Sequence, residues 1–278
     1  MQLALFILDA FAEHLFEGNP AAVMPMRTWL DDAVLGQLAA ENRCSETAFY
    51  RPCAPPGRTA GPRVAYELRW FSPSVEVELC GHATLAAAGQ LFDDVHPRER
   101  EIAFSTASGW LVARRAGRRR VCLDLPSQLL QPVPVDPVVS AALGLEVLEA
   151  HLGADLVLIA RDADAVRALS PDWRVLRRLP VRGVAVSAPS DEHGVDFVSR
   201  WFGAQAGIDE DPVTGSLHCA LGPLWADRLG RARLFARQLS ARGGSLALEV
   251  RDGRVQVTGG YVRYAAGVVT LSSAEVGT

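Results

Sequence analysis

The feature of this chain that most limits its possible folds is one short pattern that occurs in both halves. An Arg-Trp-Phe tripeptide at residues 69–71 begins twelve positions before Gly81, and the same tripeptide at residues 200–202 begins fifteen positions before Gly215. The two glycines are 215 − 81 = 134 residues apart, which is close to half of the 278 residues. Each glycine follows an acidic loop and opens an apolar helix pattern. Six tryptophans make a chance repeat conceivable, but the matching helix starts favour a duplication that produced two similar lobes.

Patterns typical of strands and helices alternate along both halves, which predicts an α/β (α+β) protein. The strand patterns cover residues 3–10, 21–24, 46–51, 64–71, 75–79, 101–113, 120–125, 151–160, 183–187 and 195–202. Short strands follow residue 246, with turns expected at 252–253, 259–260 and 266–267. Helix patterns cover 31–43, 83–91, 162–169 and 173–179, and another helix begins at Gly215.

The four prolines of residues 126–137 indicate a linker without a strand or helix pattern. We therefore expect an N-terminal lobe of residues 1–125 that also takes in a C-terminal strand, 266–278. The C-terminal lobe would then comprise residues 126–265. Pseudo-symmetry between the lobes would place an active site in the cleft between them.

The chain contains no lysine, because all 28 of its Lys and Arg residues are arginine. Enzymes that form a Schiff base on lysine, and NTPases with a Walker A lysine, are thereby excluded. Protein kinases are excluded as well, since they need a strand lysine for the ATP phosphates. The chemistry of this chain has to come from other side chains.

Charge, cysteine content and the first residues predict a soluble, cytoplasmic protein. The formal net charge is −4, which offers no basic surface for nucleic acid, and the arginine cluster at residues 114–120 fits a hairpin tip. Five cysteines without a Cys-x-x-Cys pair suit a reducing compartment, and the six histidines show no metal-binding spacing. The apolar run at residues 1–8 is too short for a signal peptide or a membrane span.

The two repeated helix starts are candidate anion sites. A glycine followed by a polar residue leaves backbone N–H groups free at the positive end of a helix dipole. Gly81 with His82, and Gly215 with Ser216, could together hold a small carboxylate or enolate. Ordinary helix capping is the alternative for each start taken alone.

Three ionisable residues near these motifs are candidates for proton transfer: Glu46, His82 and Asp211. Removing a proton from carbon requires a carboxylate or an imidazole that is held toward the C–H bond. Alternatively, Glu46 is a solvated loop carboxylate, and Asp211 only stabilises the positive end of the following helix.

Five motifs in order along the chain resemble the phenazine-biosynthesis-like (PhzF-type) isomerase family. They are Gly-Asn-Pro-Ala-Ala-Val at 18–23, Ser-Glu-Thr-Ala-Phe at 45–49, Arg-Trp-Phe-Ser-Pro at 69–73, Leu-Cys-Gly-His-Ala-Thr at 79–84 and Asp-Pro-Val-Thr-Gly-Ser at 211–216. The resemblance runs from residue 1 to about residue 271. It implies the diaminopimelate-epimerase-like fold, in which each of two pseudo-symmetric domains wraps a curved sheet or barrel around a central helix.

The resemblance also implies a cofactor-independent isomerase that moves a proton on a small carboxylate-bearing substrate. Glu46 would be the general acid/base, while His82, Asp211 and Ser216 would orient the substrate. The family further suggests a homodimer, and it implies no metal and no organic cofactor.

Two alternatives remain for the activity. Related two-thiol epimerases place a catalytic cysteine at the position of Cys80, but the second half has Pro212 at the counterpart position. An epimerase or racemase would then use Glu46 together with Cys80. The other alternative is a catalytically silent scaffold that binds ligands or proteins. The context of residues 211–221 and 242–244 resembles the broad, functionally unassigned branch of the family, so the resemblance names no substrate.

Overall fold

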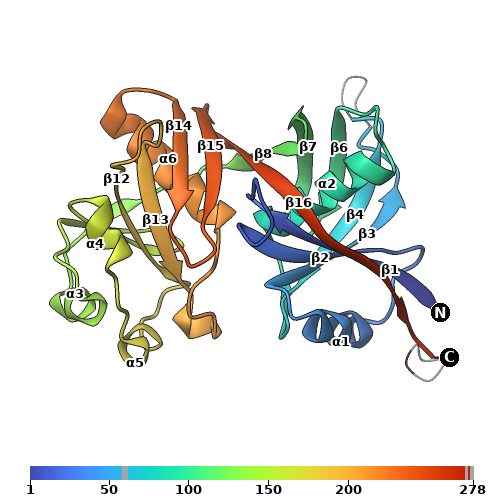
Figure 1. Ribbon diagram of the computed structural model, residues 1–278, viewed down its shortest axis with the longest axis horizontal. Helices are drawn as coiled ribbons and strands as arrows, with labels where there is room; N and C mark the ends of the chain where they lie inside the picture. Colours follow the sequence, from blue (N-terminus) through green and yellow to red (C-terminus); the bar gives the residue numbers. More distant parts are fainter. Residues whose placement is uncertain (58–61, 273–274, 276–278) are drawn as a thin grey trace. The chain divides into compact units, whose positions relative to one another are not determined.

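The computed structural model describes residues 1–57, 62–272 and 275. The chain divides into two compact units (Figure 1). Unit 1 comprises residues 1–124 and 258–278, and unit 2 comprises residues 125–257. The expected second boundary, between residues 265 and 266, falls inside the long strand β16 (Arg254–Thr270).

Unit 1 is a closed sheet around one helix. Its barrel strands are β1 (Gln2–Ala10), β2 (Asn19–Pro25), β3 (Glu46–Cys53), β4 (Ala65–Phe71), β6 (Glu101–Thr106), β7 (Gly109–Gly117), β8 (Arg120–Pro126) and β16. These strands neighbour one another in that order in the described residues, and β16 also pairs with β1, which closes the barrel. Closure leaves no free edge for a further strand to pair with. Helix α1 (Asp32–Asn42) and the short β5 (Glu76–Val77) lie outside the ring of eight strands.

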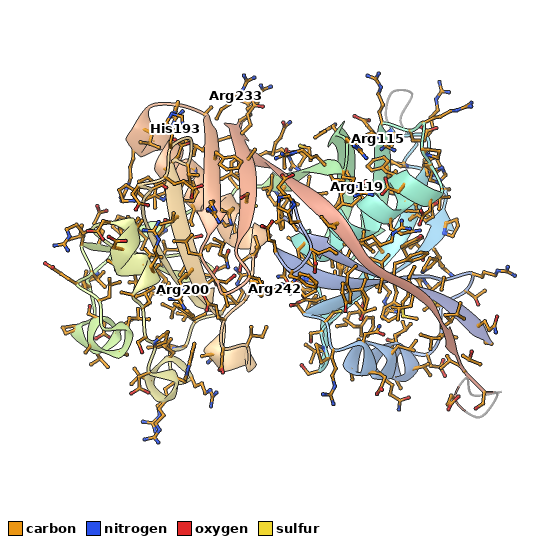
Figure 2. The ribbon with its side chains drawn as sticks, viewed as in Figure 1. Arg115, Arg119, His193, Arg200, Arg233 and Arg242 are labelled. Carbon is orange, nitrogen blue, oxygen red and sulfur yellow. The ribbon has the colours of Figure 1, made fainter. Side chains whose placement is uncertain are left out.

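The central helix of unit 1 is α2 (Gly81–Asp94), and every residue from Gly81 to Phe92 is buried. It contacts β1, β2, β3 and β7. A helix can be enclosed in this way only if its side chains are small, and α2 carries five residues of this kind between positions 83 and 89, four alanines and a glycine. At the C-terminal end of α2, Arg115 donates to the carbonyl of Phe92 at 2.9 Å and so satisfies a carbonyl of the last turn (Figure 2).

Unit 2 also combines a sheet with one long helix, α6 (Gly215–Leu229), which contacts strands β14 (Arg233–Gln238) and β15 (Gly244–Arg251). The sheet continues through β13 (Phe197–Phe202), β12 (Val184–Pro189), β11 (Leu156–Ile159), β10 (Glu149–Leu152) and β9 (Gln131–Val133). Three short helices complete the unit: α3 (Pro137–Leu143), α4 (Ala163–Arg167) and α5 (Trp173–Leu176). Their apolar residues share one core with β12 and β13.

The repeated tripeptide makes the same arginine clamp in each unit. Arg69 binds both oxygens of Glu76 at 2.7 Å, and its guanidinium lies 5.1 Å from the ring centroid of Phe71. Arg200 binds both oxygens of Glu210 at 2.7 and 2.9 Å, and its guanidinium also lies 5.1 Å from a ring, that of Phe202 (Figure 2). A bidentate pair that also stacks on a ring requires arginine rather than lysine.

The predicted fold class is confirmed, as are most of the expected elements. Two expected strands were wrong, because each is a hairpin. Residues 101–113 divide into β6 and β7 at a turn before Gly109, whose φ is +96°. Residues 151–160 divide into β10 and β11, where the Gly153 N–H donates to the Asp155 carbonyl at 3.0 Å.

The C-terminal turns expected at 259–260 and 266–267 were also wrong, because β16 is continuous through both. Gly259 and Gly260 instead allow residues 11 and 12 to approach the strand. A Cβ on Gly259 would lie 2.3 Å from the Phe11 ring, and one on Gly260 would lie 2.4 Å from the Ala12 carbonyl.

The remaining differences are small. The expected strand 75–79 shrinks to β5, the linker 126–137 contains β9, and the patterns did not predict α3 or β14. Of the expected strand 266–278, residues 273, 274 and 276–278 lie outside the described residues. Within the described residues, no helix combines the length and the apolar character needed to cross a bilayer.

Candidate active site

Two chain elements of unit 1 bring Glu46 and His82 together. Glu46 is the first residue of β3, and His82 lies in the first turn of α2. Strand β2 pairs in parallel with β3, with Ala21 opposite Glu46. Gly18 supplies the turn into β2, where its φ is +67° and a Cβ would lie 2.2 Å from the Ala10 carbonyl. The Gly-Asn-Pro, Ser-Glu-Thr and Cys-Gly-His motifs therefore contribute to one place in the barrel.

The Glu46 carboxylate faces the His82 ring. Oε2 of Glu46 lies 3.0 Å from Nε2 of His82, and the two side chains are only 15% and 7% exposed. This is an ion-pair distance, but among the described residues no donor makes an aligned hydrogen bond to the fully buried Oε2. The exposed part of Glu46 therefore lies on its other atoms.

The other side of the same imidazole faces Cys80 and Asn19. Sγ of Cys80 lies 3.5 Å from Nδ1 of His82 and 4.0 Å from Nε2. The Asn19 amide nitrogen lies 3.3 Å from Nδ1, and Ser45 donates to the Asn19 carbonyl oxygen at 2.8 Å. His82 is thus held between a thiol and a carboxylate.

The surroundings give these groups different charges. Burial alone would lower the pKa of His82, but Cys80 and the Glu46 carboxylate outweigh burial and raise that pKa well above its ordinary value. Burial, with a further contribution from the Glu46 charge, raises the pKa of the Cys80 thiol. The Glu46 carboxylate therefore favours the protonated form of His82, and burial favours the neutral form of Cys80.

In unit 2, Asp211 and Thr214 form a buried network with Gln238. The Thr214 hydroxyl donates to Oδ2 of Asp211 at 2.6 Å, and the Gln238 amide donates to the Asp211 carbonyl at 2.8 Å. The Gln238 carbonyl oxygen accepts from the Thr214 N–H at 2.9 Å. This network fixes the residue before α6, so Asp211 supports the helix start in addition to any role toward a ligand.

Ser216 lies beside an arginine that the sequence patterns did not single out. Arg182 donates to the Ser216 hydroxyl at 3.1 Å and forms an ion pair with the buried Asp155. The Arg182 guanidinium also lies 5.7 Å from the ring centroid of Trp201. No motif spacing could have predicted Arg182, because it follows a loop with no helix or strand pattern of its own.

The two helix starts share an uncapped N-terminus. The residues before them, Cys80 and Thr214, have extended backbones and make no side-chain cap hydrogen bond. Neither first turn carries an acidic residue. Side-chain capping, the alternative expected at Gly81 and Gly215, is therefore not present at either start.

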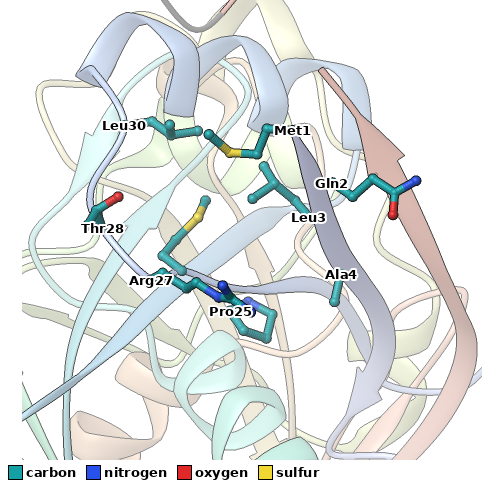
Figure 3. A pocket seen from close by; sticks show the side chains of 9 residues that line it. Met1, Gln2, Leu3, Ala4, Pro25, Arg27, Thr28 and Leu30 are labelled. Carbon is teal, nitrogen blue, oxygen red and sulfur yellow. The ribbon is translucent and has the colours of Figure 1, made fainter. Parts of the chain in front are cut away.

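A separate cavity of about 680 Å³ in unit 1 contains none of the predicted site residues. It lies between residues 1–4 and residues 25–30, and Figure 3 shows the side chains around it. Its lining residues include no carboxylate and no histidine, and Arg27 is its one ionisable side chain. The cavity is therefore unsuited to acid/base chemistry.

Comparison with known proteins identifies the family of this chain. Residues 8–267 match the family model described as phenazine biosynthesis-like protein. An uncharacterised isomerase of Pseudomonas aeruginosa is 44% identical over 98% of this chain and 100% of its own length. A human phenazine biosynthesis-like domain-containing protein is 36% identical, over 97% of this chain and 100% of its own. The crystal structure of a PhzF-family phenazine biosynthesis protein from Enterococcus faecalis matches with a TM-score of 0.90 at 42% identity, covering 98% of this chain and 100% of that one. The chain therefore belongs to the phenazine biosynthesis-like protein family and is an enzyme of the isomerase class.

Proposed function

We propose that the protein is a cofactor-independent isomerase that moves a proton on a small carboxylate-bearing substrate, with Glu46 as the general acid/base. The observation that carries this proposal is the pairing of Glu46 with His82 in a nearly dry position at the start of α2. A carboxylate that is held in a fixed position and is mostly shielded from water is a suitable general base for removing a proton from carbon.

The arrangement gives His82 a positioning role. Its Nε2 holds Oε2 of Glu46, which leaves the other carboxylate oxygen to take a proton from the substrate and return it at a second carbon. The uncapped N–H groups of Gly81 and His82 would stabilise negative charge that develops on the substrate. In unit 2, we propose that Gly215, Ser216 and Asp211 orient the polar groups of the substrate.

Exchange of substrate hydrogen with heavy water tests the role of Glu46. The purified protein is incubated in D2O with a panel of small unsaturated and hydroxy carboxylates, and proton NMR follows deuterium uptake at carbon. We expect Glu46→Gln to slow exchange at least about 100-fold, the usual contribution of a positioned general base. Glu41→Gln, at an exposed position of α1, is the matched control and should leave the rate unchanged. Exchange by Glu46→Gln within threefold of the unchanged protein would refute the proposal.

An epimerase that uses Glu46 with Cys80 is the second candidate, because both side chains contact the same imidazole. It predicts loss of optical rotation in a chiral substrate, and Cys80→Ala should abolish that loss. A proton shift by Glu46 alone would retain its rate in Cys80→Ala and would move a double bond. If the protein is a silent binding module, a bound carboxylate would stabilise it against heat, but no hydrogen of the carboxylate would exchange with the solvent.

That both helix starts serve one substrate remains a prediction, as do the homodimer and the cytoplasmic location. A double mutant tests the first of these. If Ser216→Ala and Glu46→Gln act on one substrate, their effects on turnover should be strongly non-additive.

A further inference from the structure

We infer that Glu46, Cys80 and His82 form a binding site for a thiophilic divalent cation such as Zn²⁺ or Co²⁺. The three side chains come from the starts of β3 and α2, and one ligand atom from each lies within 4.8 Å of the other two. We call these residues the Glu-Cys-His cluster. Sequence spacing did not indicate this site, because one of the ligands comes from a distant strand.

The distances within the cluster are close to those of a zinc site. Sγ of Cys80 lies 4.0 Å from Nε2 of His82, and that nitrogen lies 3.0 Å from Oε2 of Glu46. Ligands bound at the usual zinc distances to sulfur, nitrogen and oxygen stand about 3.3–3.6 Å apart in a tetrahedron. These two separations therefore have to change by about 0.5 Å or less, and the third, from Sγ to a Glu46 oxygen, is within 4.8 Å; side-chain rotation can bring the three atoms onto one cation.

The buried oxygen of Glu46 supports a cation at this position. Oε2 is fully buried, and its neighbour Nε2 of His82, 3.0 Å away, makes no aligned hydrogen bond to it, nor does any other donor in the described part of the chain. A buried carboxylate oxygen without an aligned donor costs free energy, and a cation bound between Oε2, Nε2 and Sγ would lower that cost. One carboxylate and one thiolate would also balance the two positive charges of the cation.

The chemistry of the ligands selects the kind of cation. A thiolate and an imidazole favour Zn²⁺ and Co²⁺, whereas Mg²⁺ and Ca²⁺ prefer sites made of oxygen alone. Three protein ligands leave the fourth position of a tetrahedral ion open. Water would occupy that position. Binding displaces the protons of Cys80 and His82, which pass to solvent.

Occupation of the cluster has a consequence that rests on the proposed function. A cation on Oε2 and Nε2 holds the carboxylate that would act as the base together with its positioning partner. The bound protein is therefore inhibited, and a chelator restores it. The site acts as a reversible block on proton transfer and supplies nothing to the reaction itself.

Titration of the protein with Co²⁺ tests the site without any substrate. We expect one equivalent of Co²⁺ to produce a thiolate-to-cobalt charge-transfer band in the near ultraviolet, and Zn²⁺ to abolish the band by displacement. Mg²⁺ in large excess should leave the cobalt band unchanged. Cys80→Ser, which changes one atom, should lose the band and weaken Co²⁺ binding at least about 100-fold.

Two further variants complete the design. Glu46→Gln should weaken Co²⁺ binding but keep the thiolate band at saturation. Cys53→Ser is the matched control, since Cys53 is the more accessible thiol of unit 1 and lies outside the cluster, and it should bind as the unchanged protein does. No band in the unchanged protein, or an undiminished band in Cys80→Ser, would overturn the proposal.

The inhibition is measured separately from binding. Heavy-water exchange should fall as Zn²⁺ saturates the site and return with a chelator, and Cys80→Ser should be insensitive at the same Zn²⁺ concentration. Cobalt binding without any exchange in the metal-free protein would leave the cation site standing and contradict the proposed isomerase. Exchange that requires Glu46, together with no cobalt band, would support the proposed isomerase and overturn the cation site.

Discussion

Gly89 has a role in packing that one added methyl group should reveal. It lies inside α2, and a Cβ there would be 2.8 Å from the Tyr261 ring on β16, where an ordinary contact is at least 3.4 Å. The ring would have to move by about 0.6 Å. It is buried, and its hydroxyl donates to Asp93 at 3.0 Å.

Opposing effects set the size of the change. Alanine is better than glycine inside a helix by about 1 kcal/mol. Overpacking costs about 1–3 kcal/mol, and loss of the Tyr261 hydrogen bond costs about 1 kcal/mol more. We therefore expect Gly89→Ala to lower the free energy of unfolding by about 1–3 kcal/mol.

Urea unfolding followed by circular dichroism measures this change, and Gly36→Ala is its control. Gly36 lies inside α1, where an added Cβ would meet nothing within 4 Å. That variant should gain about 0.5–1 kcal/mol from helix propensity alone. In a double mutant, Tyr261→Ala should remove most of the cost of Gly89→Ala. A Gly89→Ala protein as stable as Gly36→Ala would refute the packing argument.

Two further predictions concern titratable groups. Burial lowers the pKa of His218 to about 4, and its neutral ring faces the Thr214 carbonyl at 2.9 Å. Because the unfolded imidazole binds its proton near pH 6.5, stability should fall as the pH drops from 6.5 to 4, by at most about 3 kcal/mol. Urea unfolding at pH 7 and pH 5 should show a loss of stability at the lower pH that His218→Asn lacks. If NMR shows that the ring of His218 in the folded protein titrates near pH 6.5, the prediction is wrong. Cys53 is partly exposed while the other four cysteines are buried, so iodoacetamide should label it first. The pKa of the Cys53 thiol is raised by burial and by Glu67, so mass spectrometry should find faster labelling above pH 9 than at pH 7. Earlier labelling of any of the four buried cysteines would contradict this prediction.

The central helices and the duplicated plan could be predicted from the sequence because their signals are local. A glycine after an acidic loop, followed by small apolar residues, marks the start of each helix. The five motifs likewise identified Glu46, His82 and Asp211 as candidates.

Contacts between distant segments could not be predicted in this way. The approach of Glu46 to His82 depends on the parallel pairing of β2 with β3, which no local pattern encodes. Arg182 reaches Ser216 across 34 residues and belongs to no motif. Gly259 looks like a turn in the sequence, yet it is required by Phe11 from the other end of the chain.

The strand that closes the barrel of unit 1 imposes an order on biosynthesis. Strand β1 pairs along its whole length with residues 261–270 of β16, which are made after all of unit 2. Unit 2 is continuous from residue 125 to residue 257 and is already complete by then. The N-terminal segment must therefore wait with an open edge while the later unit folds, since its missing strand is made after that unit. A nascent chain that stops before residue 258 carries Glu46 and His82 but lacks the strand that closes the barrel, so the barrel that carries both residues should close only after unit 2 has been made.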